Sequence, residues 1–342
     1  MNTIKRLLGI TFALTAFAFA SSVQAQQTLS ATVTLSPANE VPPVTGPNAT
    51  ATGTATITIT PTLDVTGVIT GGSVRFQVTA TFPNPQGNVN GLHIHQAPAG
   101  TNGPIVIPTD VSDASAILAS GTVTIDRTVS NVSAALIQGL IASPAGFYTN
   151  LHTTANPGGA MRGQLDSIAA VPLTGITCHT VCFRSPTFFA AQLALNPINN
   201  IPVGLIFIPG DNANGPVLTT APFKPFLILY MLKPLNSLAI PFNNPFLRLR
   251  RVFIALQLSL LPGNGFTKGP ENAILNSTLA CHGITINPIV LSNGALITNN
   301  TSLLTLFLQV QQAFKSNNVA DMNALATVLE LLTAGSTFGA CQ

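Results

Sequence analysis

The sequence has very little charge. Lys, Arg, Asp and Glu together make up 7% of its 342 residues, against about 25% in an average soluble domain. Coiled coils and disordered polyelectrolytes both need far more charge, so both classes are excluded. The formal net charge of +3 is too small to indicate a nucleic-acid-binding surface. No apolar run beyond the N-terminus reaches the roughly 18 residues of a membrane-spanning helix, which excludes a multi-pass membrane protein.

Signatures of the common enzyme classes are also missing. The sequence has no phosphate-binding glycine loop, no dinucleotide-binding fingerprint after a strand, no His-Glu-x-x-His and no Ser-His-Asp signature. Carboxylates are too sparse for an obvious glycosidase pair, and tryptophan, a usual platform for sugars, is absent. The sequence therefore shows no motif of these enzyme classes.

Residues 1–25 have the pattern of a signal peptide. Two basic residues precede an apolar stretch from Leu7 to Ala20, and Val23-Gln24-Ala25 places small residues at the two positions that signal peptidase recognises. We expect the mature chain to begin at Gln26 and to be secreted or periplasmic, like a bacterial envelope protein. Its partner would then be a protein or another envelope component, with no nucleic acid and no transmembrane segment in the mature chain.

Residues 26–167 have the pattern of an antiparallel β-sandwich. Short segments such as Ser73–Phe82 alternate apolar and polar residues, which is typical of strands with one buried face. Glycine and proline turn signals separate these segments at regular spacing, as in sandwiches and barrels. One segment, Val132–Ile141, has apolar residues at helical spacing and predicts a single short helix.

The remainder of the chain has a different pattern. Residues 168–176 are expected to form a linker or a boundary strand, and residues 177–342 a mainly helical domain. The last two predicted helices flank Ser316–Asn318, a loop with capping residues, so they are expected to form a helical hairpin. The predicted helices are Pro222–Leu232, Asn244–Leu261, Pro270–Ala280, Thr301–Lys315 and Ala320–Ala334.

All four cysteines lie in this second part: Cys178, Cys182, Cys281 and Cys341. An even number of cysteines in an exported chain predicts two disulfides. Three pairings are open, of which we favour Cys178–Cys182 with Cys281–Cys341. A metal site is the alternative, because histidine follows both Cys178 and Cys281.

The first part resembles the CHRD domain, a module first described in chordin. Four segments, in order and at approximately the expected spacing, carry the resemblance over about residues 28–167. It implies an all-β sandwich, immunoglobulin-like or superoxide-dismutase-like, and a binding or structural role without an established activity. The segments are Asn39–Pro43, His93–His95 with Gly100–Pro104, Tyr148–Thr153, and Gly159–Gln164.

Three histidines of this part are candidates for a metal site. His93 and His95 are two residues apart in a predicted strand, so both side chains point to the same face. His152, on another predicted strand, is the natural third ligand. Three neutral imidazoles suit copper or zinc, and copper(II) generally binds nitrogen ligands more tightly. The alternative is a polar network in which backbone carbonyls, Asn150 or Tyr148 bond the imidazoles without any metal.

The arrangement is similar to copper/zinc superoxide dismutases, where a His-x-His strand and a later histidine bind copper and an arginine on the final strand steers the anion. By position these would be His93, His95, His152 and Arg162. The zinc-binding loop, the metal-bridging histidine and the disulfide of that family have no counterpart in the first part. The resemblance therefore implies at most a mononuclear copper-binding redox protein, which is the alternative function. Arg162 is otherwise expected to pair with Glu40 or Asp166.

Overall fold

The computed structural model of the protein describes residues 27–83, 87–112, 121–174, 178, 206–208, 217–219, 244–260 and 277–335. The signal peptide, the helix predicted at Pro222–Leu232, Cys182 and Cys341 lie outside these residues. In the described part, no helix is both long enough and apolar enough to cross a membrane.

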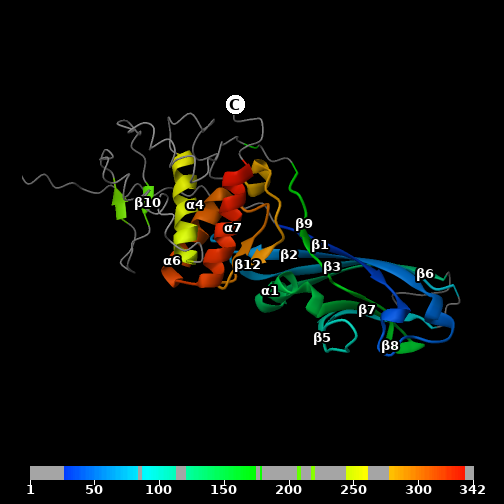
Figure 1. Ribbon diagram of the computed structural model, residues 1–342. Helices are drawn as coiled ribbons and strands as arrows, with labels where there is room; N and C mark the ends of the chain where they lie inside the picture. The colour runs from blue at the N-terminus through cyan, green and yellow to red at the C-terminus, as the bar shows by residue number, and fades with distance from the viewer. Residues whose placement is uncertain are drawn as a thin grey trace, which may run out of the picture.

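Two antiparallel sheets pack face to face in the first part of the chain (Figure 1), which confirms the predicted sandwich. One sheet has the strand order β6-β3-β2-β1-β9 and the other β5-β4-β7-β8. The strands are β1 (Leu29–Leu35), β2 (Thr52–Leu63), β3 (Ile69–Thr81), β4 (Val89–Gln96), β5 (Ile105–Pro108), β6 (Thr122–Ser133), β7 (Phe147–Thr153), β8 (Asn156–Gln164) and β9 (Ala169–Ala170). Three short 3-10 helices, η1 (Pro37–Asn39), η2 (Pro47–Thr50) and η3 (Pro144–Gly146), connect them.

The sandwich core follows from the alternation of side chains along each strand. Ile57 of β2 pairs with Phe76 of β3, and both side chains are fully buried. Leu92 and Ile94 of β4 meet them from the second sheet within the same apolar cluster. The side chains between these positions face away from the core, and on β4 they are histidines.

The predicted short helix is present as α1 (Ala134–Ala142), which directly follows β6. Ser133 begins it because its hydroxyl accepts a hydrogen bond from the Leu136 backbone N–H. Its apolar face, with Ile137 and Leu140 fully buried, closes one end of the sandwich core.

The second part of the chain is mainly helical, as predicted. Ser302 caps α6, and Asn317 ends it in the left-handed conformation, with φ 51°. Asn318 then accepts a hydrogen bond from the Asp321 N–H at the start of α7. The helices are α4 (Pro245–Leu260), α6 (Leu303–Ser316) and α7 (Val319–Gly335), with the short η4 (Leu279–His282) and the strand pairs β10 (Ile206–Ile208) with β11 (Val217–Thr219) and β12 (Ile289–Val290) with β13 (Leu296–Ile297).

The described end of the helix predicted at Pro270–Ala280 is not α-helical. Thr278 is extended and forms a β-bridge with Ser302, and the Leu279 N–H bonds the carbonyl of Thr301. These backbone bonds to a distant segment replace those that an α-helix would make, and only the 3-10 turn η4 follows.

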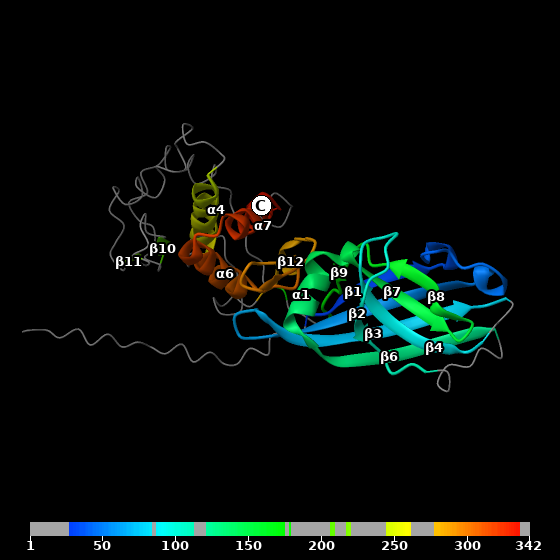
Figure 2. The ribbon, with the colours of Figure 1, turned by 90° about the horizontal axis from the view of Figure 1, so that it is seen from below.

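The helical part covers one end of the sandwich (Figures 1 and 2). Backbone hydrogen bonds join the β2–β3 hairpin to the β12–β13 turn, from Ile69 N–H to Gly294 and from Leu296 N–H to Gly67. Leu296 lies in the sandwich core, whereas Val68 of the hairpin packs against the helical core. Each part therefore contributes an apolar side chain to the core of the other.

The structure contains a disulfide between Cys178 and Cys281, with Cα atoms 5.2 Å apart. Both pairings that we favoured, Cys178–Cys182 and Cys281–Cys341, are therefore wrong. The physical reason is the path of the chain after β9, where Asn300 donates a hydrogen bond to the carbonyl of Val171 and holds the segment before Cys178 against the helical part. The two remaining cysteines, Cys182 and Cys341, are now the predicted second pair.

We expect the sandwich to fold without the helical part when the fragment ends after β9, at residue 172. Its core is continuous, but loss of Leu296 would expose one end of it, so the melting temperature should fall below that of the full chain. A fragment ending at residue 167 should melt lower still, because β9 pairs with Leu29 and Ser30 of β1. Thermal unfolding followed by circular dichroism measures both effects, and a soluble 26–172 fragment without a cooperative transition would contradict this boundary.

Candidate metal centre

The three candidate histidines lie on the face of the second sheet that points away from the sandwich core. His93 and His95 alternate along β4 with the core residues Leu92 and Ile94, and β4 pairs with β7, which carries His152. Although this face is the outer one, His95 and His152 are only 7% and 8% exposed. His95 and His152 are thus buried, and His93 is half-buried, in a polar layer rather than in the core.

The structure brings the three imidazoles together. Each offers one nitrogen, and these nitrogens all lie within 4.8 Å of one another. The ring centroids of His93 and His152 are 5.0 Å apart, and those of His95 and His152 are 5.7 Å apart. Side chains from two strands therefore converge on one point, as in a mononuclear site.

A glycine makes room for this convergence. Gly91 pairs with His152 across the β4–β7 ladder. A Cβ atom at position 91 would lie 2.8 Å from Cε1 of His93 and 3.4 Å from the Cβ of His152. The ring of His93 occupies the space that any other residue's side chain would fill.

Backbone carbonyls fix two of the imidazoles in one tautomer. Nδ1 of His95 lies 3.0 Å from the carbonyl oxygen of Gly103, and Nδ1 of His152 lies 3.0 Å from that of Pro157. A carbonyl only accepts, so both Nδ1 atoms carry the proton and both Nε2 atoms present a lone pair. Metal-binding histidines are commonly oriented by this kind of hydrogen bond.

The inward nitrogens have no hydrogen-bond partner among the described residues. Nε2 of His95, Nε2 of His152 and Nδ1 of His93 are all buried and unsatisfied. Tyr148 and Asn150, the side chains that a polar network would use, bond elsewhere: the Tyr148 hydroxyl accepts from Gly103 N–H, and the Asn150 amide donates to Glu40. A polar network therefore accounts for Nδ1 of His95 and Nδ1 of His152, which bond backbone carbonyls, but not for the three unsatisfied inward nitrogens.

Burial lowers the pKa of all three histidines, and for His93 it does so to about 4, with help from the neighbouring His152 and His95. The rings are therefore neutral at pH 7, the state in which an imidazole binds a metal. Because these folded-state pKa values lie below 6.5, the histidines stabilise the fold above pH 6.5 and destabilise it as the pH falls from 6.5 towards 4.

Arg162 does not form the ion pair that the sequence led us to expect with Glu40 or Asp166. It is 2% exposed and makes no ion pair within 4.0 Å with Glu40, Asp166 or any other described carboxylate. Its guanidinium donates instead to Asn102 Oδ1 at 3.1 Å and to the carbonyl of Thr101 at 3.0 Å. The ion-pair prediction is wrong because the 97–104 loop reaches Arg162 and supplies neutral acceptors.

The four segments that carry the CHRD resemblance meet around this layer. Asn39 donates to the carbonyl of Arg162, and Asn102 donates to the carbonyl of Val41. Tyr148 and Glu40 also belong to this layer, but in other roles than the sequence predicted: Tyr148 bonds Gly103 rather than an imidazole, and Glu40 accepts from Asn150 rather than from Arg162. One signal in the sequence indicated that Glu40 and Tyr148 belong to the site: although far apart in sequence, both lie in segments that carry the CHRD resemblance.

Glu40 is the most perturbed carboxyl group of this layer. Burial raises its pKa to about 7, although the nearby Arg162 and the hydrogen bond from Asn150 both act to lower it. One of its oxygens, Oε1, has no hydrogen-bond partner among the described residues. Ionisation of Glu40 therefore lowers the free energy of unfolding of the protein.

Replacing Glu40 with glutamine should stabilise the protein at pH 8 and leave its stability almost unchanged at pH 4.5. The folded-state pKa lies above the unfolded value, so the contribution of wild-type Glu40 is fully present below about pH 4.5 and is lost as the pH rises through 7. Melting temperatures of both proteins from pH 4.5 to 8 measure the difference. A Glu40→Gln protein that is less stable than wild type at pH 8 would contradict a buried, destabilising carboxylate.

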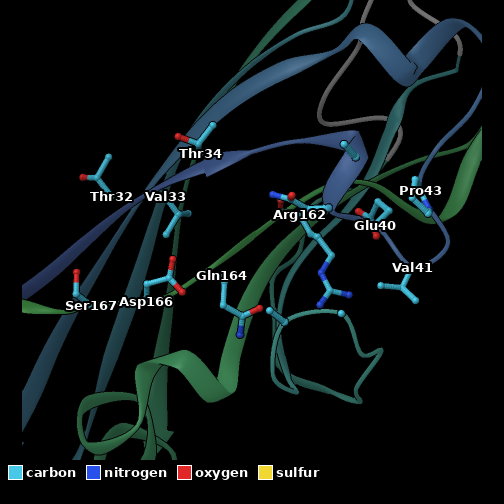
Figure 3. Close-up of a pocket in the computed structure, with 14 residues that line it drawn as sticks. Thr32, Val33, Thr34, Glu40, Val41, Pro43, Arg162, Gln164, Asp166 and Ser167 are labelled. Carbon is cyan, nitrogen blue, oxygen red and sulfur yellow. The ribbon is translucent and has the colours of Figure 1, made fainter.

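A cleft of about 880 Å³ lies beside the polar layer, between β1 and the chain around β8 (Figure 3). Arg162 and Glu40 lie towards one end of it with Val41 and Pro43, while Asp166 and Ser167 lie towards the other. None of the three histidines lines the cleft, so the cleft and the histidine cluster are separate features. Arg162 lines the cleft and also belongs to the polar layer around the histidines.

Comparison with known proteins agrees with this geometry. The family model of the CHRD domain matches residues 31–165. No curated protein and no solved structure matches the chain. The matched residues span β1 to β8 and contain the motif segments that meet around the histidines. The N-terminal sandwich of this chain is therefore a CHRD domain.

Proposed function

We propose that this chain is an exported, non-enzymatic binding protein whose CHRD domain binds one copper ion through His93, His95 and His152. The observation that carries the proposal is the convergence of three neutral imidazoles whose inward nitrogens are buried and have no hydrogen-bond partner in the described part of the chain. Leaving such groups unsatisfied is costly, and a metal ion would satisfy all of them at once. Export is supported by the pattern of residues 1–25.

Copper is favoured over zinc by the donor set. The cluster offers three imidazole nitrogens, and the described residues add no thiolate or carboxylate to it. Copper(II) exceeds zinc in intrinsic affinity for nitrogen ligands. When bound there, copper would supply a redox-active centre or a structural cross-link between β4 and β7.

The dismutase-like alternative is less well supported. It needs an arginine that faces an anion beside the metal, but the guanidinium of Arg162 is buried against Tyr148 and bonded to Asn102 and Thr101. Two of its N–H groups are thus already bonded to neutral oxygen atoms of the protein. We therefore favour a binding role over turnover.

Metal analysis of the mature protein purified without a polyhistidine tag tests the proposal. Titration with copper(II), in competition with a chelator of known affinity, should reveal one site per chain, and zinc should bind the same site more weakly. No copper site tighter than nonspecific surface binding would remove the metal proposal. The histidines would then be a structural polar layer.

Gly91→Ala provides a variant that keeps every proposed ligand. Its added methyl group must displace the ring of His93, and a displaced ligand weakens a site that depends on fixed geometry. We expect at least about tenfold weaker copper binding, within the range seen for lost outer contacts. Gly146→Ala is the matched control, because Gly146, like Gly91, is not among the glycines with positive φ, and nothing lies within 4 Å of a Cβ there. Equal copper affinity in Gly91→Ala and wild type would exclude the proposed position of His93.

A further inference from the structure

Arg162 and Tyr148 form a stack with His95 across three neighbouring strands. Tyr148 is on β7, which lies between β4, with His95, and β8, with Arg162. The His95 and Tyr148 rings are nearly parallel, at 10°, with centroids 4.9 Å apart. On the β8 side, the guanidinium carbon of Arg162 lies 3.7 Å from the centre of the Tyr148 ring.

The same two residues also hold the carbonyl that orients His95. The Tyr148 hydroxyl accepts a hydrogen bond from the Gly103 N–H, and the Gly103 carbonyl accepts from His95 Nδ1. Arg162 donates to Thr101 and Asn102 in the same loop. His95 is therefore held twice, through its ring face and through its Nδ1 proton.

Burying an arginine costs free energy when no carboxylate pairs with it, and Arg162 has none within 4.0 Å in the part of the chain that the structure describes, so its presence there calls for a physical role. The cost of burying Arg162 is offset by its contact with the aromatic face of Tyr148 and by hydrogen bonds to two neutral oxygens. Tyr148 stacks on His95, and the two oxygens belong to the loop whose Gly103 carbonyl bonds His95. No described contact of its guanidinium points to a role in pairing the two sheets. Its interactions are those of a group that supports a neighbouring side chain.

We infer that Arg162 and Tyr148 are positioning residues that hold His95 in the Nδ1–H tautomer with Nε2 directed at the other two imidazoles. This inference rests on the proposed function only for its consequence, which is metal affinity. The orientation of His95 is a property of the metal-free protein and can be measured in it. Lysine at position 162 would keep the charge, but it lacks the planar group that both stacks and bonds two oxygens.

The experiment compares Arg162→Lys and Tyr148→Phe with wild type. Tyr148→Phe keeps the ring and removes only the acceptor for Gly103. Arg75→Lys is the matched control, because Arg75 is an exposed arginine paired with Asp126 on the other sheet. The first readout is the imidazole ¹⁵N spectrum of metal-free protein at pH 7.5, which distinguishes Nδ1–H from Nε2–H. The second is copper(II) affinity with the electron paramagnetic resonance spectrum.

We expect His95 in wild type and Arg75→Lys to be the Nδ1–H tautomer, and Arg162→Lys and Tyr148→Phe to show a mixture. Copper affinity should fall by about 10- to 100-fold in Arg162→Lys, with altered resonance parameters, and by less in Tyr148→Phe. Variants that melt at lower temperature but keep the wild-type tautomer and copper spectrum would overturn the inference. If Arg162→Lys does not fold, a wild-type ¹⁵N spectrum in Tyr148→Phe overturns it.

The two proposals can fail separately. A wild type that binds no copper, with a tautomer that still depends on Arg162, would contradict the metal proposal and support the positioning role. Copper binding by the wild type, with equal affinity in Arg162→Lys, would support the metal proposal and contradict the positioning role.

Discussion

Replacing His95 with alanine should abolish stoichiometric copper binding. His95 supplies one of three inward nitrogens, and its loss leaves two imidazoles and a gap in the polar layer. Removing an outer-shell contact of a metal ligand already costs about 10- to 100-fold in affinity, so removing a ligand should cost more than ~100-fold. Competition titration with copper(II) at pH 7.5 measures the change.

The control for this variant is His282→Ala. His282 belongs to η4 in the helical part, where its ring bonds Ser277, and it is not a member of the cluster. We expect copper binding of that protein to equal that of wild type. Equal losses in the two variants would mean that copper binding does not depend specifically on the cluster, and the proposed site would then be wrong.

The second large effect concerns the disulfide between Cys178 and Cys281. The bond joins residues 103 positions apart, and a cross-link of that length stabilises a fold by about 4.7 kcal/mol through restriction of the unfolded chain. Cys281→Ser should therefore lower the unfolding free energy of the helical part by roughly that amount. The transition of the sandwich should change much less, because its core contains neither cysteine.

A double-mutant cycle distinguishes this bond from other effects of the substitutions. Cys178→Ser, Cys281→Ser and the double variant should be destabilised by nearly the same amount, because each removes the same bond. Peptide mapping without reduction should find Cys178 joined to Cys281, and, by elimination, Cys182 to Cys341. Losses that simply add in the double variant, or free thiols in the unreduced wild type, would contradict this connectivity.

The sequence was sufficient for the sandwich because alternation along a strand is a local property. Val74 and Phe76 alternate with polar residues, and the structure buries both completely. The helices α6 and α7 could be predicted for the same reason, since Ser302 and Asn318 mark their starts. β5 was missed because its four residues, Ile105–Pro108, are too few to show a period.

Only part of the candidate site was within reach of sequence reasoning. The spacing of His93 and His95 predicts a shared face, but not that this face is covered. Its burial depends on the loops that contain Glu40 and Gly103, and these approach the sheet through contacts between distant segments. The misassigned role of Arg162 has the same origin, because its acceptors come from the loop around Asn102.

The disulfide pairing could not be derived from cysteine spacing either. Cys178 and Cys182 are close in sequence, which made a local bridge attractive. The structure instead places Cys178 beside η4, because the chain after β9 runs along Asn300 of the helical part. This path depends on packing between the two parts of the chain, and no local sequence pattern predicts it.

X-ray diffraction from crystals of the copper-loaded mature protein, recorded on both sides of the copper absorption edge, tests the central claim most directly. The account predicts one anomalous peak per chain, about 2 Å from a nitrogen of each of His93, His95 and His152, with Nδ1 of His95 still bonded to Gly103. A strong peak at another position, such as the mature N-terminus, with none among the three imidazoles, would contradict it.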